Sequence, residues 1–439
     1  MKRFALFLAL LLIAAPAVAQ WQLPIGIPAT PMDLFRVRPA NTALVSTVPS
    51  TIAAGQVVTL SGQVPGRTVT CAGTVTNPAW ILGTPGSRLI GPLSITGTGC
   101  LIDGVTGYVI SLSGDGHLLR HSEFSGVPTD RQMTGISVNG TNIVVFRNKV
   151  HDFGNLNATD DQDAHGMGCS RGCRNVWFVE NDSARNSGDG VNVNPYPYDA
   201  AGLTAISHIF IGRNTLHDNK QTGQWAKQST DIIVSENEIY GHHASNSSYG
   251  QGAGYQYSTN RIWFLKNNLH DNDVGIGVSG GFEGAPVSGA VLLANTITRA
   301  KGTSCGDGPV WSCAGIRLTG DAYTYLLNNT LTDVIDGVHA VNGRGLYVAG
   351  TVGNTHVATE NTPSIPGVDL AARYKEAYGL DISSLTGTAP VIPPPPQPPP
   401  VITPIPPVPP VTPPAPPNLP PCPRTLLGRL AYIFGRCVW

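Results

Sequence analysis

Short apolar strands that end in asparagine recur along most of the chain. Residues 143–148 and 176–181 are two examples, and each reads as a run of branched or aromatic residues closed by a polar pair. Further copies end at Asn214, Asn237, Asn267, Asn295 and Asn329, so that successive terminal asparagines are 33, 33, 23, 30, 28 and 34 residues apart. A second strand follows each copy after a polar turn. It begins with glycine and alternates between apolar and polar residues, as in residues 190–194.

An alternation with a period of two places one side chain inward and the next outward. A repeat of two strands without a helix predicts one coil of a β-solenoid, whose coils stack because no single coil buries its apolar side. The repeated asparagine suits a turn, where it tolerates the left-handed conformation, and the amides of successive coils can bond in a ladder. We therefore predict an all-β chain that winds as a parallel β-helix.

The repeat predicts a β-helix over residues 45–354. Residues 20–44 are expected to cap the first coil, because an open coil end exposes unpaired backbone and apolar core. Residues 355–389 contain a helix candidate at 366–380, which could cover the other end. Residues 390–423 hold 20 prolines among 34 residues. Proline lacks an N–H and fixes φ, so this segment is predicted to be a polyproline linker.

The two ends of the chain predict export and a tail. Lys2 and Arg3 precede an apolar run, and small residues follow it, so residues 1–19 are predicted to be a signal peptide. The run is too short to span a bilayer, and we expect no transmembrane segment. The protein is thus expected to be secreted, periplasmic or at the cell surface. Residues 424–439 form an amphipathic tail, either a docking peptide for a partner or surface or a remnant without function.

The composition limits the classes of partner that the protein can bind and suggests disulfides. Charged residues make up 13% of the chain and the net charge is −1, which argues against nucleic-acid binding. Eight cysteines in an exported chain suggest disulfides, although their connectivity stays open. Proximity in the sequence favours four pairs: Cys71 with Cys100, Cys169 with Cys173, Cys305 with Cys313, and Cys422 with Cys437.

Aligning the glycine-led strands brings polar side chains together on the outer face. Neighbouring strands of a parallel sheet lie about 4.8 Å apart, so residues at equal positions become neighbours. Six residues from three successive strands are expected to share one patch: Asn192, Asn194, Trp225, Lys227, Gln256 and Ser258. Amides and hydroxyls around an aromatic plane suit an extended polysaccharide, with Trp225 as the stacking platform.

Over most of residues 45–354 the coils resemble the pectate-lyase-like superfamily of right-handed parallel β-helix proteins. Residues 227–237 are similar to β-helix polysaccharide lyases that keep a strand lysine just before the next coil. In such lyases the lysine removes the proton beside a uronate carboxylate, which a calcium ion held by aspartates neutralises. The resemblance implies Lys227 as the base and Ca²⁺ bound by Asp163, Asp189 and either Asp161 or Asp160.

A lysine must be neutral to act as a base, so its pKa has to fall through desolvation or nearby cations. His165, near the start of the same strands, is a second catalytic candidate. The group that protonates the leaving oxygen stays open among five residues: His165, Tyr196, Tyr198, Arg185 and Arg261.

Other activities use this fold. Residues 163–165 (Asp-Ala-His) resemble the Asp-Pro-His motif of alginate C5-epimerases, with alanine in place of proline. Polygalacturonase-type hydrolases are resembled only at residues 158–161. The leading hypothesis is a polysaccharide lyase that cleaves a uronic-acid polymer by β-elimination, with an epimerase or glycoside hydrolase as further alternatives. From another class, a non-catalytic glycan-binding or cell-surface protein, such as an adhesin, is the alternative, because β-helices also serve these roles.

Overall fold

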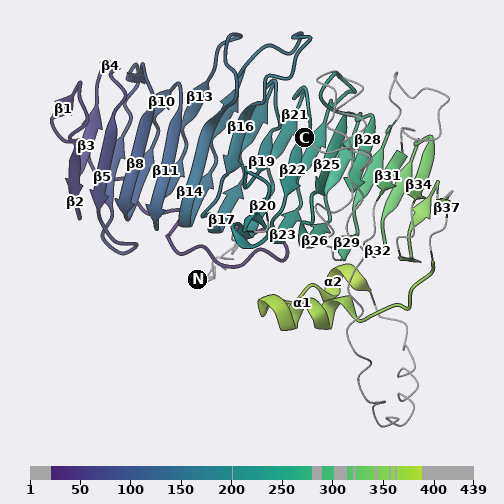
Figure 1. The fold of residues 1–439 in the computed structure, drawn as a ribbon. Coiled ribbons are helices and arrows are strands. Elements are labelled where there is room, and N and C mark those ends of the chain that lie inside the picture. The colour runs from purple at the N-terminus through teal and green to yellow at the C-terminus, as the bar shows by residue number, and fades with distance from the viewer. Residues whose placement is uncertain are drawn as a thin grey trace, which may run out of the picture. The chain divides into compact units, whose positions relative to one another are not determined.

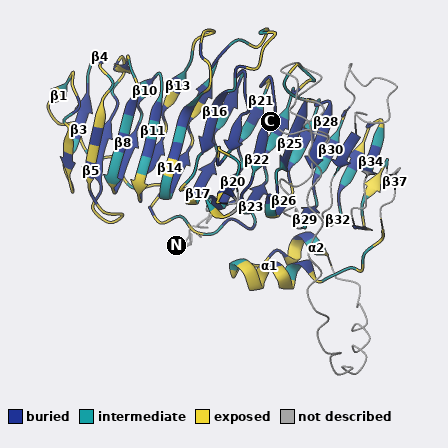
Figure 2. Ribbon diagram, in the orientation of Figure 1, coloured by how far each residue is buried: buried dark blue, intermediate teal, exposed yellow. Residues whose placement is uncertain are grey.

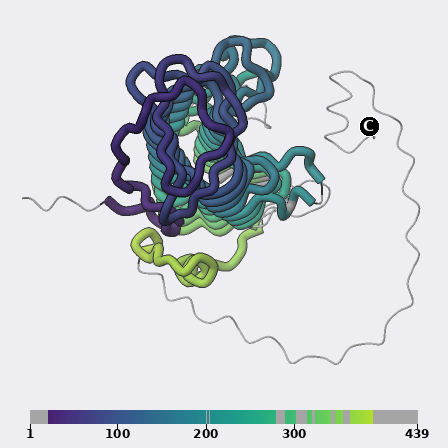
Figure 3. The backbone as a smooth tube through the Cα atoms, turned by 90° about the vertical axis from the view of Figure 1, so that its left-hand side faces the viewer, coloured from purple at the N-terminus to yellow at the C-terminus, as the bar shows by residue number. Residues whose placement is uncertain are grey.

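The computed structural model describes residues 21–199, 201–278, 289–300, 314–319, 323–341, 345–354, 357–360 and 363–387. Over these residues the chain winds through stacked coils whose strands form parallel sheets (Figure 1). Each strand pairs with its counterpart one coil later, as β19 (Val191–Val193) pairs with β22 (Gln224–Lys227). Figure 3 shows the coils one behind another, as the predicted solenoid requires.

In the described residues the strands form three sheets along the stack, which we call sheets 1, 2 and 3. The long strand β14 (Met133–Phe146) contributes its first part to sheet 1 and the rest to sheet 2. Sheet 1 contains β2 (Thr51–Ala53), β5 (Thr68–Ala72), β8 (Leu93–Thr98), β11 (Ile110–Asp115), the first part of β14, β16 (Ala164–Cys169), β19, β22, β25 (Gln251–Gln256), β28 (Val274–Val278), β31 (Ala314–Leu318), β34 (Asp336–Val341) and β37 (Val357–Glu360). Sheet 2 contains β1 (Leu44–Val45), β3 (Val57–Leu60), β6 (Ala79–Leu82), β9 (Cys100–Asp103), β12 (Leu118–Arg120), the rest of β14, β17 (Arg174–Val179), β20 (Ser207–Gly212), β23 (Thr230–Ser235), β26 (Asn260–Leu265), β29 (Ala290–Leu293), β32 (Thr324–Leu327) and β35 (Leu346–Ala349).

Sheet 3 is built from short strands: β10 (Thr106–Gly107), β13 (Glu123–Ser125), β15 (Lys149–His151), β18 (Asp182–Ala184), β21 (Thr215–His217), β24 (Glu238–Tyr240), β27 (Asn268–His270), β30 (Thr296–Thr298), β33 (Thr330–Thr332) and β36 (Val352–Gly353). A two-stranded pair, β4 (Gln63–Val64) with β7 (Arg88–Leu89), lies in the early coils. A 3-10 turn occupies Gly202–Thr204.

Apolar side chains fill the inside of the coils, as Figure 2 shows by the buried positions along the strands. Ile136, Met167 and Val191 stand in register in sheet 1 and are fully buried. Each such side chain contributes about 1.5–3 kcal/mol by leaving water. A side chain leaves water only when a coil lies on either side of it, so this free energy is gained only if the coils stack.

Glycine begins the strands of sheet 1 because the next coil comes too close for a side chain. A Cβ on Gly190 would lie 2.6 Å from the carbonyl oxygen of Gly223, and one on Gly223 would lie 2.6 Å from that of Gly252. Such contacts are far inside van der Waals distance, so only glycine fits. The glycine signal in the sequence is therefore a packing requirement between coils.

The predicted asparagine ladder is confirmed. Asn148 donates its Nδ2 hydrogen to Oδ1 of Asn181 at 3.0 Å, and Asn181 donates in the same way to Asn214 at 3.0 Å. The chain of bonds continues through four further members: Asn237, Asn267, Asn295 and Asn329. We expected the asparagine to adopt the left-handed conformation, but the residue before it does so. Arg147 (φ 53°) and Glu180 (φ 54°) carry the turn instead.

The terminal segments do not lie as expected. Instead of capping the first coil, the segment after residue 20 runs along the outer face of sheet 2, where Ser235 Oγ and Trp177 Nε1 donate to the carbonyls of Ile25 and Pro28. Helix α1 (Leu370–Tyr378) packs beside it, and α2 (Ser383–Thr386) follows. The buried Tyr374 contacts Trp263 and donates its hydroxyl to the carbonyl of Gly26 at 2.6 Å. The outer face of sheet 2 is apolar, and the N-terminal segment and α1 pack on it.

One predicted disulfide is formed, between Cys71 and Cys100, whose Cα atoms are 5.6 Å apart. The expected pair of Cys169 with Cys173 is not formed, and both residues are buried thiols. Burial and the neighbouring Cys173 raise the pKa of the Cys169 thiol well above its usual range. Thiols in that state react slowly.

Several predictions concern residues outside the described ranges: the signal peptide at 1–19, the linker at 390–423, the tail at 424–439, and the pairs Cys305–Cys313 and Cys422–Cys437. Among the described residues, no helix has the length and apolar character needed to cross a membrane.

Candidate functional site

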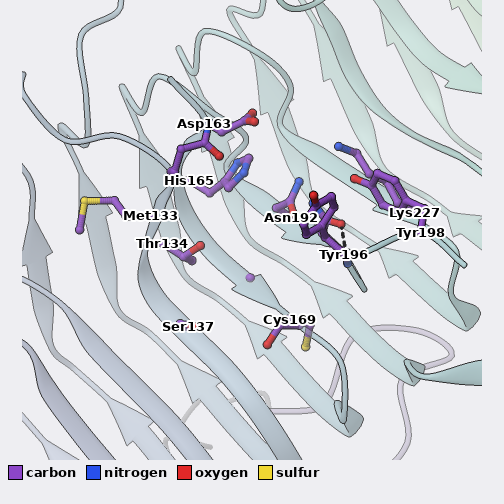
Figure 4. Close-up of a pocket in the computed structure, with 14 residues that line it drawn as sticks. Met133, Thr134, Ser137, Asp163, His165, Cys169, Asn192, Tyr196, Tyr198 and Lys227 are labelled. Carbon is purple, nitrogen blue, oxygen red and sulfur yellow. Dashed lines mark hydrogen bonds between the residues drawn. The ribbon is translucent and has the colours of Figure 1, made fainter. Parts of the chain in front are cut away.

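A groove of about 530 Å³ opens on the outer face of sheet 1, where β14, β16, β19 and β22 lie side by side (Figure 4). Five predicted site residues line it together: Asp163, His165, Asn192, Asn194 and Lys227. The preceding coil adds Gln132, Met133, Thr134 and Ser137, which the sequence did not single out. The parallel register therefore assembles one concave surface from segments about one coil apart.

Gln256 does not stand where the alignment of glycines placed it. Trp225 pairs with Gly254, and Lys227 pairs with Gln256, so β25 is shifted by two residues from the expected register. The glycine that follows Gly223 in the column is Gly252 rather than Gly254. A shift of two residues preserves the face of each side chain. Gln256 thus remains on the outer face but lies next to Lys227.

Two predicted sugar-binding residues are buried. Only 7% of Trp225 is exposed, and its ring packs so closely on Gly254 that a Cβ there would lie 2.4 Å from it. Ser258 is 1% exposed and has a left-handed backbone (φ 64°) beyond the end of β25. The alternation predicted that both side chains would be exposed, but the packing of the sheet buries them. Neither residue therefore offers a face to a ligand.

His165 lines the groove with a fixed tautomer. Its Nδ1 accepts the backbone N–H of Asp189 at 2.8 Å, so the neutral ring carries its proton on Nε2. Burial lowers the pKa of His165, although the carboxylates of Asp189 and Asp163 oppose this. The ring is therefore a neutral hydrogen-bond donor and has no free lone pair with which to act as a base.

Asp189 lies behind the groove, 2% exposed, with both carboxylate oxygens already bonded. Oδ1 accepts from the Thr222 hydroxyl at 2.6 Å, and Oδ2 accepts from Asn192 Nδ2 at 2.5 Å. Asp189 thus orients Asn192 and, through its backbone, His165.

Asp161 and Asp163 share one donor, the side-chain amide of Gln221, at 2.7 and 2.9 Å. Desolvation and the neighbouring carboxylate of Asp163 raise the pKa of Asp161 to about 6. Desolvation opposes ionisation of Asp163, yet His165 and the Gln221 amide hold the pKa of Asp163 below its usual value. The carboxyl of Asp163 is therefore a much stronger acid than that of Asp161.

These carboxylates do not fit the predicted calcium site. Calcium takes six to eight oxygen ligands, with several from carboxylates. Asp189 is committed to Thr222 and Asn192, and the described residues contain no group of three acidic, histidine or cysteine side chains arranged to hold a metal ion. Calcium binding at Asp161, Asp163 and Asp189 therefore stays a prediction without a geometric basis.

Lys227 stands at the end of the groove, its Nζ 5.8 Å from the centre of the Tyr198 ring. Burial lowers the pKa of Lys227, but the charges of Tyr198, Asp189 and Asp163 outweigh it, so the pKa lies above its ordinary value. The side chain is therefore an ammonium at neutral pH. That state does not suit the predicted role as a base, which needs a neutral amine.

The loop after β19 supplies Tyr196 and Tyr198, two of the five candidates for the group that protonates the leaving oxygen. Tyr196 is 73% exposed, and its ring meets Tyr198 edge-on at 5.6 Å. Tyr198 also contacts Tyr257, at 4.8 Å. The alternation Pro-Tyr-Pro-Tyr at residues 195–198 was the available signal, because two prolines restrict the backbone of the loop that carries both rings.

The two arginines considered as acids lie elsewhere. Arg185 is bonded to Asp152 at the end of β18, and Arg261 is bonded to Asp231 on sheet 2. Both guanidinium groups are committed to carboxylates away from the groove, so neither serves the site.

A family model described as "Right handed beta helix region" matches residues 198–357. The described coils and this match agree on the fold. The chain is a right-handed parallel β-helix. A search of curated proteins gives no match.

Several solved structures are similar to this β-helix. The A-module of mannuronan C-5 epimerase AlgE6 from Azotobacter vinelandii is 16% identical, with 72% of this chain and 92% of that chain covered and a TM-score of 0.44. Pectate lyase Pel9A is 14% identical (73% and 74% covered, TM-score 0.34). The Streptococcus pneumoniae surface protein and adhesin PfbA is 10% identical (73% and 90% covered, TM-score 0.41). Likeness at this level concerns the fold alone.

Proposed function

We propose that this β-helix acts on a uronic-acid-containing polysaccharide by removing the proton on the carbon beside the carboxylate. The observation that carries the proposal is the pairing of Lys227 with Tyr198 in a groove where His165 is held as a neutral donor. Both β-elimination and epimerisation begin with this step. A protein that catalyses this step is a lyase or an epimerase.

The positive charge of Lys227 suits the substrate carboxylate. It is the only lysine or arginine among the described residues that line the groove. Removal of the neighbouring proton spreads negative charge onto that carboxylate, and a fixed cation stabilises this charge in the transition state. The Nε2–H of His165 is a second donor for the same group, as a neutral imidazole can polarise a carbonyl. Lys227 thus takes a binding role in place of the predicted role as base.

Tyr198 is the proton-transfer group that the geometry favours. Burial raises the pKa of Tyr198, and the charge of Lys227, which interacts with its hydroxyl, opposes this rise, so the reactive phenolate is the minor form. The phenolate takes the proton from carbon, and the resulting phenol returns it to the leaving oxygen as the bond from that oxygen to the ring breaks. A carbon–carbon double bond then remains in the product. In epimerisation, water on the opposite face instead gives a proton to the same carbon, and the Tyr198 phenol releases its proton to solvent.

Tyr196 and Asn194 complete the binding surface. The exposed ring of Tyr196 offers an apolar face to a sugar, which the buried Trp225 does not. Asn194 lines the groove, and its Oδ1 accepts the Tyr196 N–H at 3.1 Å. The predicted export signal at residues 1–19 agrees with a polymeric substrate outside the cell.

Hydrogen exchange at the carbon and ultraviolet absorbance together detect the shared first step. The protein is incubated in D₂O with alginate, pectate and glycosaminoglycans, and deuterium in the sugar is read by NMR while ultraviolet absorbance follows the unsaturated product. Deuterium at the carbon without absorbance identifies an epimerase, and absorbance identifies a lyase, because elimination leaves no hydrogen on that carbon. Lys227→Met is expected to lose at least about 100-fold in the rate of whichever signal the unaltered protein gives.

Lys266→Met is the matched control, because Lys266 is an exposed lysine paired with Glu236 at 3.2 Å outside the groove. It should react like the unaltered protein. Neither exchange nor unsaturated product on any polymer, with retention on a glycan column that Tyr196→Ala abolishes, would instead establish the non-catalytic glycan-binding protein. Exchange or product formation that persists in Lys227→Met overturns the role of Lys227.

A further inference from the structure

The loop that carries Tyr196 and Tyr198 lies outside the strands. It leaves β19 at Asn194 and contains Pro195 and Pro197, which have no N–H to donate. Carbonyls outside a sheet ladder take donors from other segments or from water.

One side chain provides those donors. Arg171 donates from Nε to the carbonyl of Pro195 at 2.6 Å and from Nη2 to the carbonyl of Pro197. The same Nη2 lies 2.6 Å from Oδ1 of Asp199, in an ion pair. The three acceptors stand at alternate positions, on either side of the two tyrosines. A planar fork with five donors suits such a set, whereas a lysine is a point charge.

Arg171 itself is held on the turn that follows β16. Gly172 has a left-handed backbone (φ 98°), and its N–H donates to the carbonyl of Ala205 at 3.1 Å. The buried Cys169 and Cys173 flank the turn. The base of the arginine is thus anchored to the core of the coil, while its guanidinium reaches the loop. Arg171 does not line the groove.

We propose that Arg171 is a positioning residue that holds Tyr198 against Lys227 without touching the substrate. The inference rests on the proposed function, because Tyr198 is the group whose position matters there. A small displacement of a reacting group costs a large factor in rate. Loss of the clamp therefore reduces the chemical step more than binding.

Kinetics in the exchange assay test this role. Arg171→Ala is expected to lower kcat about 10- to 100-fold with little change in KM, and Arg171→Lys should recover part of the loss because one or two of the three acceptors stay bonded. Arg185→Ala is the matched control, since Arg185 is a half-exposed arginine bonded to one carboxylate at another corner of the same coils. It should leave kcat unchanged. A rise in KM at constant kcat in Arg171→Ala overturns the inference.

A second measurement needs no substrate. Tetranitromethane nitrates accessible tyrosines, and mass spectrometry locates the product. Tyr198 should be nitrated several times faster in Arg171→Ala than in the unaltered protein or in Arg185→Ala, with the same far-ultraviolet circular dichroism in all three. Equal nitration rates overturn the inference. If the unaltered protein turns over no polymer, the proposed function fails, and nitration alone decides whether Arg171 holds the loop.

Discussion

The Nζ of Lys227 lies 5.8 Å from the centre of the Tyr198 ring, so a strand of one coil meets the loop that leaves the preceding coil. The register of β19 with β22 brings Asn194 next to Lys227, and the loop after Asn194 then returns over the lysine. This contact explains why Lys227 is held as a cation. It also explains why Tyr198, one of five candidates for protonating the leaving oxygen, becomes the leading proton-transfer group.

The rate of exchange should rise with pH. Burial raises the pKa of Tyr198 above its ordinary value near 10, although Lys227 opposes this, so only a small fraction is phenolate at neutral pH. Below that pKa the rate is expected to rise about tenfold per pH unit. The rise should end where Lys227 loses its proton, above 10.5. Initial rates between neutral and strongly alkaline pH measure the slope, and Tyr198→Phe should abolish the activity. A profile that is flat or falls with pH contradicts Tyr198 as the base.

Removal of divalent cations should leave the activity within about twofold of its starting value. The expectation follows from Asp189, whose oxygens are bonded to Thr222 and Asn192 and so are not placed for a cation. Protein treated with EDTA and dialysed is compared with the same sample after addition of calcium. An activity that disappears with EDTA and returns only with calcium would restore the calcium site that the resemblance implies.

Asn214→Ala should lower the free energy of unfolding by about 3–5 kcal/mol. Asn214 is fully buried and donates to Asn237 at 3.0 Å and to the carbonyl of Phe178 at 2.8 Å, while its Oδ1 accepts from Asn181. Alanine leaves these groups buried without partners. Denaturant unfolding measures the change. Asn246→Ala, at an exposed site with one bond to the carbonyl of Thr159, is the control and should cost under about 1 kcal/mol.

His242→Asn should make the protein more resistant to acid. Asn219, His242 and Asn272 form a second ladder of buried side chains, in which His242 takes the place of an asparagine. His242 contacts Asn219 at 3.3 Å and Asn272 at 2.8 Å. Burial lowers the pKa of His242 from 6.5 to about 4, against the bond to Asn272, so the folded protein keeps it neutral. The unfolded chain binds the proton first, and stability falls as pH drops from 6.5 toward 4.

That loss is on the order of 3 kcal/mol for a shift of this size. Asparagine supplies a donor and an acceptor without titrating, so the variant should keep its stability over this range. Thermal midpoints at a series of pH values measure the effect, and His121→Asn, at a half-exposed histidine, is the control. Parallel pH profiles for His242→Asn and the unaltered protein would show that the second ladder tolerates a charged ring.

Repetition made the fold readable from residues alone. Inward positions such as Ile136, Met167 and Val191 must be apolar in every coil, because each one packs on its neighbours. Asn181 and Asn214 recur because each amide satisfies the next, and Gly190 recurs because the adjoining carbonyl leaves no room for a Cβ. Constraints that repeat with the coil leave a pattern in the sequence.

The register of single coils left no such pattern. Gly252 and Gly254 are two residues apart and alternate equally well, and only the packing of carbonyls on Gly223 selects the first. The sequence therefore predicted which face of the sheet each side chain occupies, but not which residue lies beside it in the next coil. The same ambiguity hid the burial of Trp225, whose exposure depends on the residues packed around it.

The sequence by itself determined the coiled β-fold, its asparagine ladder and the gathering of Asp163, His165, Asn192, Asn194 and Lys227 in one groove. Only the tertiary structure decided the charge of Lys227, the tautomer of His165 and the place of Tyr198. These depend on partners that come from loops and from neighbouring coils, and such contacts are set by distances in space rather than by spacing along the chain.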